Sequence, residues 1–383
     1  MKYKIYFNKP YFTGKETQYI CQAVNAGKIS GNGNFTKKCQ QYFQERYHFH
    51  KCLLTSSCTD AMEMAAILLD IQVGDEVIIP SYTFVSTANA FVLRNAKIVF
   101  ADSMTENPNL DVEKIESLIT TKTKAIVPVH YAGIACNMDK IMDLAYKYGL
   151  FVVEDAAQAI DSFYIGKDGV KRPLGSIGHL SAFSFHETKN IISGEGGMLV
   201  INDVRFETRS EIIWEKGTNR SAFYRGEADK YEWVDIGSSF LPSEIMAAFL
   251  WAQLENIDDI QTKRKHHFNR YYEGLRAWAK QNEIRLPFVP NCATNNAHMF
   301  YMVCKSLKQR TELIKHLKEN GILAIFHYLS LHKSPFYKNK HDGRILKESD
   351  NFSDTLIRLP LYYELSEVDL QYIINTIISK QSI

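Results

Sequence analysis

The sequence predicts an α/β fold with a mostly parallel central sheet. Two observations support this. Between residues 50 and 205, short runs of consecutive apolar residues alternate with amphipathic helical patterns. Runs of this kind are typical of strands that are buried on both faces. The expected strands are residues 77–79, 98–100, 126–129, 151–153, 182–185 and 198–201. In the α/β folds that this alternation predicts, ligands bind at the carboxyl ends of the strands.

Helices are expected between several of these strands. One follows the small and hydroxyl residues at 57–60 and covers residues 61–69, and a second covers 112–119. A third covers 138–148 and is followed by Gly149, a residue that commonly ends helices.

The C-terminal part of the chain has a different pattern. Ser243 can cap a helix, and residues 244–280 have the pattern of one or two long helices. A strand at 299–303, a helix at 310–319 ended by Asn320-Gly321, and a strand at 322–326 are then expected. We therefore predict a large α/β domain of residues 1–250, with the N-terminal segment, and a smaller α+β domain of residues 251–383.

Composition excludes several classes of protein. The 383 residues are 45% hydrophobic and 23% charged, as in a globular protein too large for one small core. Lys and Arg number 45 against 43 Asp and Glu, so no general basic field would hold nucleic acid or a membrane surface. No apolar run reaches the ~20 residues of a membrane helix, and no secretory signal is evident, which predicts a cytoplasmic protein. The seven cysteines lack CxxC spacing, so neither a disulfide framework nor a metal site is expected.

Three short motifs carry chemical information. Ser57, Cys58 and Thr59 precede a helix whose first amides can bind phosphate, although an ordinary helix cap would look the same. Asp155 follows one buried strand, where a carboxylate could also serve only as a turn residue. Lys189 follows another strand and precedes a glycine-rich turn, and it could be an ordinary solvated charge.

Together, the three motifs match the requirements of a pyridoxal phosphate enzyme. The helix amides would hold the phosphate, and Lys189 would bind the cofactor's aldehyde covalently. Asp155 would keep the ring nitrogen protonated, so that the ring can accept electrons from the substrate. We therefore predict pyridoxal 5'-phosphate as the cofactor.

Longer stretches of the chain resemble the sugar nucleotide aminotransferases of the DegT family, which have the aspartate aminotransferase-like fold type I. The resemblance covers essentially the whole chain and is clearest at residues 80–91, 128–133, 183–190 and 215–221. It implies a homodimer with shared active sites that transfers an amino group from glutamate to a nucleotide-linked keto sugar. These stretches are most similar to members that convert dTDP-4-dehydro-6-deoxyglucose to dTDP-4-amino-4,6-dideoxygalactose for surface glycans such as lipopolysaccharide or enterobacterial common antigen.

The resemblance also implies the roles of individual residues. The catalytic residues would be Lys189 and Asp155. The cofactor would be bound by Ser57, Cys58, Thr59, Phe84, Asp155, Gln158, Ser184, Lys189 and Ser239. The substrate would be bound by Arg220, Tyr224, His327 and His332. In this assignment the Phe84 ring stacks on the cofactor, and Gln158 lies near its phenolic oxygen.

The chain departs from the family pattern at two of these positions. Cys58 stands where many relatives have glycine, and Ser239 stands where many have an asparagine that reaches the partner's phosphate.

Several alternatives remain open at this point. The new amine could have the gluco configuration at sugar carbon 4, or it could be placed at carbon 3. Relatives that act as sugar dehydratases replace the lysine at position 189 with histidine, and this chain retains Lys189. A non-catalytic regulator that binds pyridoxal phosphate would need a DNA-binding segment, and no basic helix-turn-helix pattern precedes the α/β region.

Overall fold

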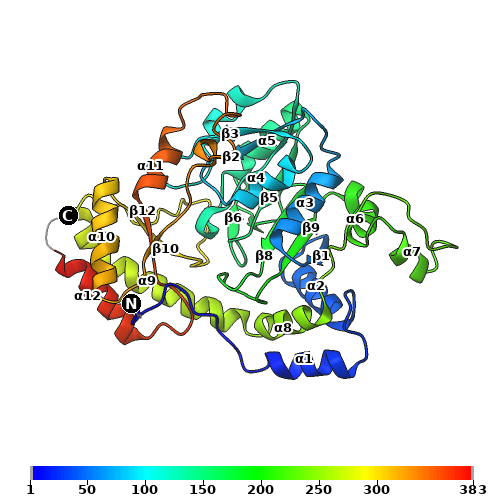
Figure 1. Cartoon of the computed structure of the whole chain (residues 1–383), viewed down its shortest axis with the longest axis horizontal. Coiled ribbons are helices and arrows are strands. Elements are labelled where there is room, and N and C mark those ends of the chain that lie inside the picture. The colour runs from blue at the N-terminus through cyan, green and yellow to red at the C-terminus, as the bar shows by residue number, and fades with distance from the viewer. Residues whose placement is uncertain (1–2, 381–383) are drawn as a thin grey trace.

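A seven-stranded sheet forms the centre of the computed structural model, which describes residues 3–380 (Figure 1). In spatial order the strands are β1 (Lys51–Thr55), β9 (Gly197–Ile201), β8 (Leu180–Ser184), β5 (Phe151–Asp155), β4 (Thr123–Ile126), β2 (Glu76–Pro80) and β3 (Lys97–Ala101). The strands from β8 to β3 are parallel, whereas β9 is antiparallel to both β8 and β1. The predicted α/β class with a mostly parallel sheet is confirmed.

Helices cover both faces of this sheet. The α-helices of the whole described chain, including those of the C-terminal part, are α1 (Glu16–Asn25), α2 (Asn34–Tyr47), α3 (Cys58–Leu68), α4 (Val85–Val92), α5 (Met138–Tyr148), α6 (Glu207–Trp214), α7 (Arg220–Tyr224), α8 (Glu244–Leu254), α9 (Ile257–Gln281), α10 (Leu307–Glu319), α11 (Lys347–Thr355) and α12 (Glu367–Ser379). Side chains alternate along β2: Ile78 joins an apolar cluster with residues of α2, α5 and α8, whereas Val77 and Ile79 join one with residues of α3, α4 and α6.

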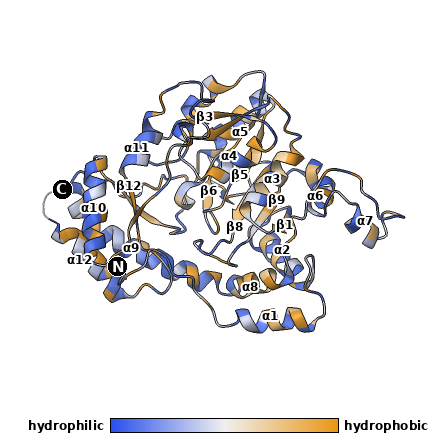
Figure 2. Ribbon diagram, viewed as in Figure 1, coloured by the Kyte–Doolittle hydropathy of each residue, from blue (hydrophilic) through white to orange (hydrophobic). Residues whose placement is uncertain are grey.

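Burial of these apolar layers fixes the sheet in place. Figure 2 shows apolar residues concentrated on the central strands. Full burial of one such aliphatic side chain contributes about 1.5–3 kcal/mol. The strand ends, where the site lies, are therefore held by a rigid support.

A three-stranded antiparallel sheet belongs to the C-terminal part. Its order is β10 (Phe300–Val303), β12 (Leu356–Leu359) and β11 (Ile325–Phe326), and its core includes residues of α9, α10 and α12. The N-terminal segment joins this part, because Ile5 forms a bridge with Ile322. A separate hairpin is formed by β6 (Phe163–Ile165) and β7 (Lys171–Pro173). The predicted boundary at residue 250 falls inside α8, and the division into two domains there stays a prediction.

The predicted helices differ in their outcome. The one expected at 138–148 is α5, which ends at Gly149 with a left-handed φ of 65°. The one expected at 112–119 is wrong, because the chain forms two 3-10 turns, Val112–Lys114 and Glu116–Leu118. The N–H of Ile115 donates to the carbonyl oxygen of Val112 (3.3 Å) and that of Ile119 to Glu116 (3.2 Å), which is the i to i+3 pattern of a 3-10 helix. Across residues 3–380, no helix has both the length and the apolar composition that crossing a bilayer requires.

Candidate active site

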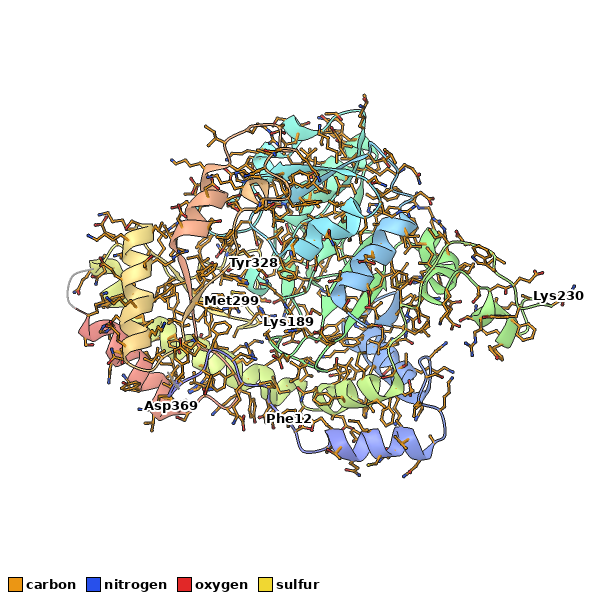
Figure 3. All side chains as sticks on the ribbon, viewed as in Figure 1. Phe12, Lys189, Lys230, Met299, Tyr328 and Asp369 are labelled. Carbon is orange, nitrogen blue, oxygen red and sulfur yellow. The ribbon has the colours of Figure 1, made fainter. Side chains whose placement is uncertain are left out.

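A cavity of about 520 Å³ lies at the carboxyl ends of β5 and β8. Nine of the predicted site residues line it: Ser57, Cys58, Thr59, Phe84, Asp155, Gln158, Ser184, Lys189 and His327. Its other side is closed by residues of the C-terminal part, among them His298, Tyr328 and Arg358. Figure 3 shows Lys189 and Tyr328 near the middle of the molecule. The structure thus brings residues from both parts of the chain to one cavity.

The cradle at the start of α3 is suited to a phosphate group. Ser57 caps the helix by accepting a hydrogen bond from the N–H of Asp60 (3.0 Å). The N–H groups of Cys58 and Thr59 lie in the first turn, where a helix offers them no acceptor of its own. A Cβ atom on Gly197 would lie 2.3 Å from the amide nitrogen of Cys58, so only glycine lets β9 pass this close. Burial raises the pKa of the Cys58 thiol, which therefore stays neutral and does not repel an anion.

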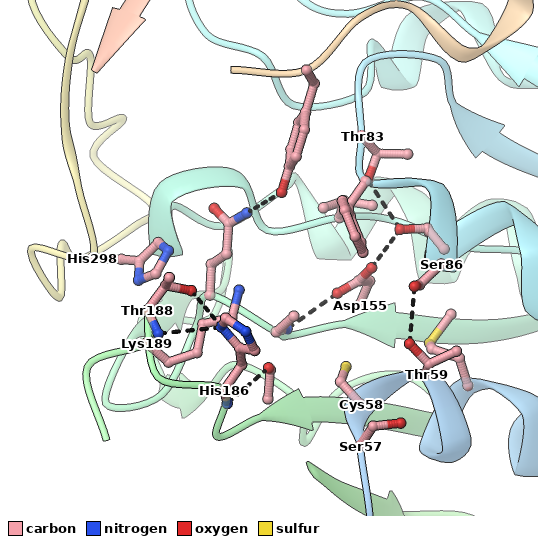
Figure 4. A pocket seen from close by; sticks show the side chains of 18 of the residues that line it. Ser57, Cys58, Thr59, Thr83, Ser86, Asp155, His186, Thr188, Lys189 and His298 are labelled. Atoms are coloured by element: carbon pink, nitrogen blue, oxygen red, sulfur yellow. Dashed lines mark hydrogen bonds between the residues drawn. The ribbon is translucent and has the colours of Figure 1, made fainter. Parts of the chain in front are cut away.

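Asp155 ends β5, and its carboxylate is held by two donors. It is 7% exposed, and it accepts hydrogen bonds from Thr87 Oγ1 (2.7 Å) and from the N–H of Ala157 (3.1 Å). Thr87 is hydrogen-bonded in turn to the hydroxyl of Thr83 (3.0 Å), and Figure 4 shows this chain of polar groups. Sequence reasoning missed both threonines, although they lie in the stretch 80–91 whose resemblance was noted.

Lys189 lies in the turn that follows β8. Its N–H donates to the carbonyl oxygen of His186 (2.9 Å), and the His186 ring contacts the hydroxyl of Thr188 (3.0 Å). Burial lowers the pKa of the Lys189 ammonium, although the nearby Cys58 and Asp155 oppose the shift. A lowered pKa increases the fraction of neutral amine, which is the form that attacks an aldehyde. In Figure 4 Lys189 and Asp155 come from neighbouring strand ends.

Gln158, Tyr328 and Phe84 form a further wall of the cavity. Gln158 accepts a hydrogen bond from the N–H of Ala132 (2.6 Å) and donates one to the hydroxyl of Tyr328 (3.2 Å). The Phe84 ring is 54% exposed, and its centroid is 6.0 Å from that of Tyr328. An exposed aromatic ring beside a cavity offers a flat surface for a bound ring to stack on. Tyr328 has a positive φ of 53°, a feature that no sequence pattern announced.

Comparison with known proteins decides the family. Residues 10–378 match the model of the DegT/DnrJ/EryC1/StrS aminotransferase family. The chain belongs to this family. It is 33% identical over 381 residues to the GDP-perosamine synthase of Escherichia coli O157:H7, with 98% of each chain covered. It is 32% identical to the spore coat polysaccharide biosynthesis protein SpsC of Bacillus subtilis, with 97% of this chain and 95% of that one covered.

Solved structures agree with this assignment. The pyridoxamine phosphate form of Spr1654 from Streptococcus pneumoniae, assigned as a sugar aminotransferase, has a TM-score of 0.88 at 26% identity and covers 97% of this chain and 98% of that one. The aminotransferase of Psychrobacter cryohalolentis has a TM-score of 0.89 at 25% identity, over 97% and 98% of the two chains. The predicted family and fold type I are confirmed, and the protein is a pyridoxal phosphate-dependent sugar aminotransferase.

The cavity of this family member fits the cofactor. The cradle at α3 and Ser184, at the end of β8, would hold the phosphate, and Asp155 would contact the ring nitrogen. Lys189 would bind the aldehyde. The close approach of Gly197 to the cradle is explained if a phosphate must reach the amides of the first turn, since a larger residue would push β9 away.

Four predicted residues lie outside this cavity. Ser239, Arg220 and Tyr224 line a second cavity of about 620 Å³, where Arg220 lies 3.7 Å from a carboxylate oxygen of Glu215. His332 is buried and shares a hydrogen bond with Ser81 (2.7 Å), so it lines neither cavity. The structure shows a hydrogen bond of His332 within the chain, and its contact with substrate stays a prediction.

His327 does line the cofactor cavity. Its ring stacks on that of Tyr328 with centroids 3.5 Å apart, and its Nδ1 contacts the hydroxyl of Tyr131 (2.8 Å). Burial lowers the pKa of His327 well below its usual value, so the ring is neutral at pH 7. His298 and Arg358, which sequence reasoning missed, complete this side of the cavity.

Proposed function

We propose that this aminotransferase converts dTDP-4-dehydro-6-deoxy-D-glucose and L-glutamate to dTDP-4-amino-4,6-dideoxy-D-galactose and 2-oxoglutarate, for the biosynthesis of a surface glycan. The observation that carries the transamination is the joint presence of Lys189 and Asp155 at one cavity with a phosphate cradle. The resemblance of residues 128–133 and 215–221 to relatives that form 4-amino-4,6-dideoxygalactose supports the choice of sugar.

The chain's own residues divide the chemistry. When bound, pyridoxal phosphate supplies an electron sink for charge that develops at the substrate carbon. The Lys189 amine moves a proton away from the donor's amine-bearing carbon in the first half-reaction, and delivers one to the sugar carbon in the second. Asp155 stabilises positive charge at the ring nitrogen in both halves, and Thr87 fixes the orientation of its carboxylate.

A second copy of the chain is part of the proposal. From α7 to the residues before α8, a projecting segment exposes several large apolar side chains, and Figure 1 shows α7 standing away from the sheet beyond α6. The exposed residues are Phe223, Tyr224, Tyr231, Trp233, Val234 and Ile236, with Trp233 83% exposed. A contiguous exposed apolar surface marks an interaction site, and a twofold partner is the commonest occupant. We infer a homodimer whose partner covers this segment and meets the cavity that contains Ser239.

The proposed cellular location is the cytoplasm. The proposal rests on the scattered cysteines, whose thiols a reducing compartment would keep unpaired.

A GDP-linked 4-keto sugar is a second candidate substrate. It is favoured by the names of two relatives, the GDP-perosamine synthases of Escherichia coli O157:H7 and of Caulobacter vibrioides, which is 30% identical over 375 residues. The two candidates share one chemistry at the ketone and differ in the base and in the ring configuration.

One assay separates these possibilities. The enzyme is incubated with glutamate and either the dTDP-linked or the GDP-linked 4-keto-6-deoxy sugar, and kcat/KM is compared. NMR of the dTDP product should then show a small coupling between the protons on carbons 3 and 4, as an axial amine requires. A large coupling would identify the product as the gluco epimer. An amine at carbon 3 would refute the proposed position of amination. A higher kcat/KM for the GDP sugar would refute dTDP as the nucleotide of the substrate.

A further inference from the structure

Three side chains that can bind a metal ion meet where α9 packs against the start of α12. His266 and His267 are neighbours in α9, and Glu367 is the first residue of α12. One ligand atom of each lies within 4.8 Å of the other two, and among residues 3–380 this is the only such group of three. None of the three lines the cofactor cavity. Figure 3 shows Asp369, in the first turn of α12, at the edge of the molecule and Lys189 near its middle.

His267 presents a buried lone pair to this group. Its side chain is fully buried, and its Nδ1 has no hydrogen-bond partner. Its other ring nitrogen, Nε2, contacts the carbonyl oxygen of Tyr363 (3.4 Å). A carbonyl oxygen can only accept a hydrogen bond, so Nε2 carries the proton of the neutral ring and Nδ1 carries none. Among the histidines of residues 3–380, no other buried ring nitrogen lacks a partner.

The group that faces this lone pair is also an acceptor. Oε1 of Glu367 lies 3.9 Å from Nδ1 of His267 and 2.7 Å from Nε2 of His266. Neither acceptor can donate to the other, so both need a cation or a donor between them. A proton on His267 would serve, but burial lowers the pKa of His267, although the Tyr363 carbonyl and Glu367 oppose the shift. The ring is therefore neutral at pH 7, and a metal ion would give both acceptors a partner.

The spacing of these atoms is close to that of a zinc site. Zinc binds histidine nitrogen and carboxylate oxygen at about 2.0–2.2 Å in a tetrahedron, so its ligand atoms lie roughly 3.4 Å apart. The separations of 2.7 and 3.9 Å lie on either side of this value. The side chains of His266 and Glu367 are 51% and 49% exposed and can adjust, whereas packing holds His267 in place. Three protein ligands leave the fourth position to water.

The surroundings favour an ion that binds nitrogen. Arg270 contacts the other carboxylate oxygen of Glu367, Oε2 (3.5 Å), and donates a hydrogen bond to Gln371 (2.9 Å). It leaves Oε1 to the histidines but adds positive charge beside the group. Hard cations such as Mg²⁺ and Ca²⁺ need several oxygen ligands, and only one carboxylate is offered here. Two neutral imidazoles instead suit zinc and the neighbouring transition metals.

A surface pair elsewhere shows what His266 and Glu367 would be without His267. His50 and Glu207 lie similarly close (2.9 Å) and are similarly exposed, and their third neighbour is the cation Lys51. That pair needs no further partner. The group at α9 and α12 differs because its third member is a buried acceptor.

We propose that His266, His267 and Glu367 bind a divalent transition metal ion such as zinc, and that this ion joins α9 to α12. The expectation that the chain has no metal site followed from the spacing of its cysteines, and this group contains none. Because the ligands come from two helices of the folded chain, the ion should bind the folded state and stabilise it. The proposal does not depend on the sugar substrate or on the transamination.

Calorimetric titration of the chelator-treated holoenzyme with zinc chloride tests the site. The wild type should bind one ion per chain with a Kd below about 100 μM, and its thermal midpoint should rise with zinc. His266→Ala and Glu367→Gln each remove one exposed ligand, and each should raise Kd roughly 100-fold or more. His50→Ala is the matched control, because it removes the histidine of the surface pair, and it should leave Kd and the rise in midpoint unchanged.

Zinc binding that is weaker, or that occurs elsewhere, would overturn the proposal. The first result is a wild-type Kd above about 100 μM. The second is equal binding by the wild type, His266→Ala and Glu367→Gln, which would place the ion at cysteines or at the cofactor phosphate instead. His267→Gln should weaken zinc binding as strongly as the other two variants. If it does not fold, zinc X-ray absorption of the wild type decides, because the proposed site requires two imidazole ligands and a single one would refute it.

Discussion

Replacement of Asp155 by asparagine should abolish most activity while leaving the fold intact. The backbone N–H of Ala157 can donate only, so the amide oxygen of an asparagine would take that position. Its NH₂ group would then face Thr87, whose hydroxyl can accept and turn its own proton to Thr83. Every polar group keeps a partner, so the loss of stability should be about 1 kcal/mol, that of weakening one hydrogen bond.

The effect on catalysis should be much larger, because a neutral amide cannot hold positive charge at the cofactor's ring nitrogen. A close ion pair contributes about 4 kcal/mol at an effective dielectric constant near 20. Loss of that amount in the transition state lowers the rate roughly a thousandfold. Both half-reactions should suffer, because the same ring accepts electrons in each.

The assay compares single-turnover rates of both half-reactions with the thermal midpoint of the same preparation. Asp168→Asn is the matched control, because Asp168 is an exposed carboxylate that pairs with Arg172 on the β6–β7 hairpin. Asp155→Asn with near-normal rates in either half would refute the reasoning. A large drop in midpoint would instead show that Asp155 supports the fold, contrary to its hydrogen bonds.

Three further predictions follow from named contacts. Lys189→Ala should abolish turnover and leave the cofactor bound without a covalent link; borohydride reduction that left Lys189 of the wild type unlabelled would contradict its role. If Ser239 reaches the phosphate in the partner subunit, Ser239→Ala should weaken cofactor binding by roughly 0.5–1.5 kcal/mol. The measurement is the cofactor concentration that restores half of the activity to the cofactor-free enzyme. A fully active monomer in gel filtration would contradict the prediction. Burial alone would raise the pKa of Glu154, but the hydrogen bonds from His130 and from backbone N–H groups outweigh burial and lower it. The ionised Glu154 side chain therefore stabilises the fold fully at pH values above its unfolded pKa of about 4.3. This stabilisation is lost as the pH falls through the lower pKa of the folded state. Glu154→Gln should thus lower the free energy of unfolding by about 3 kcal/mol at pH 7 and by less at pH 3. Urea unfolding of the wild type and the variant measures this difference at both pH values. An equal difference at pH 7 and pH 3 would count against this account.

The sequence allowed the catalytic pair to be predicted because Asp155 ends one buried strand and Lys189 lies in the turn that follows another. Apolar runs locate the strands, and parallel strands bring their carboxyl ends to one edge, so Asp155 and Lys189 meet there. The cradle at α3 could be predicted because hydroxyl residues stand directly before a helix. At Asp155, Lys189 and the cradle, the position predicted from the local sequence pattern is the position found in the structure. The family resemblance added the neighbouring Phe84 and Gln158.

The missed residues carry no such local signal. Thr87 lies inside α4, and only its packing against β5 turns its hydroxyl to Asp155. Arg358 follows the strand pattern Leu-Ile-Arg-Leu, where an arginine resembles an edge residue, and only the pairing of β12 on both sides places it in the interior. Ser239 and Arg220 line a second cavity of the same chain, and the roles predicted for them, with Ser239 at the phosphate of a partner subunit, stay predictions.

Part of the stretch 128–133, whose resemblance suggests the product, lies behind the cavity wall. Within residues 128–133, His130 is fully buried and contacts Glu154 (2.9 Å), and a Cβ atom on Gly133 would collide with Asn296. His130 and Gly133 therefore shape the wall beneath Gln158, whereas Val129 of the same stretch lines the cavity itself. Catalytic groups such as Lys189 would act alike on either face of a sugar ring. The configuration of the new amine consequently depends on how the walls from both parts of the chain orient the ring, and a wall residue that shifts them would change the epimer formed without slowing the proton transfers.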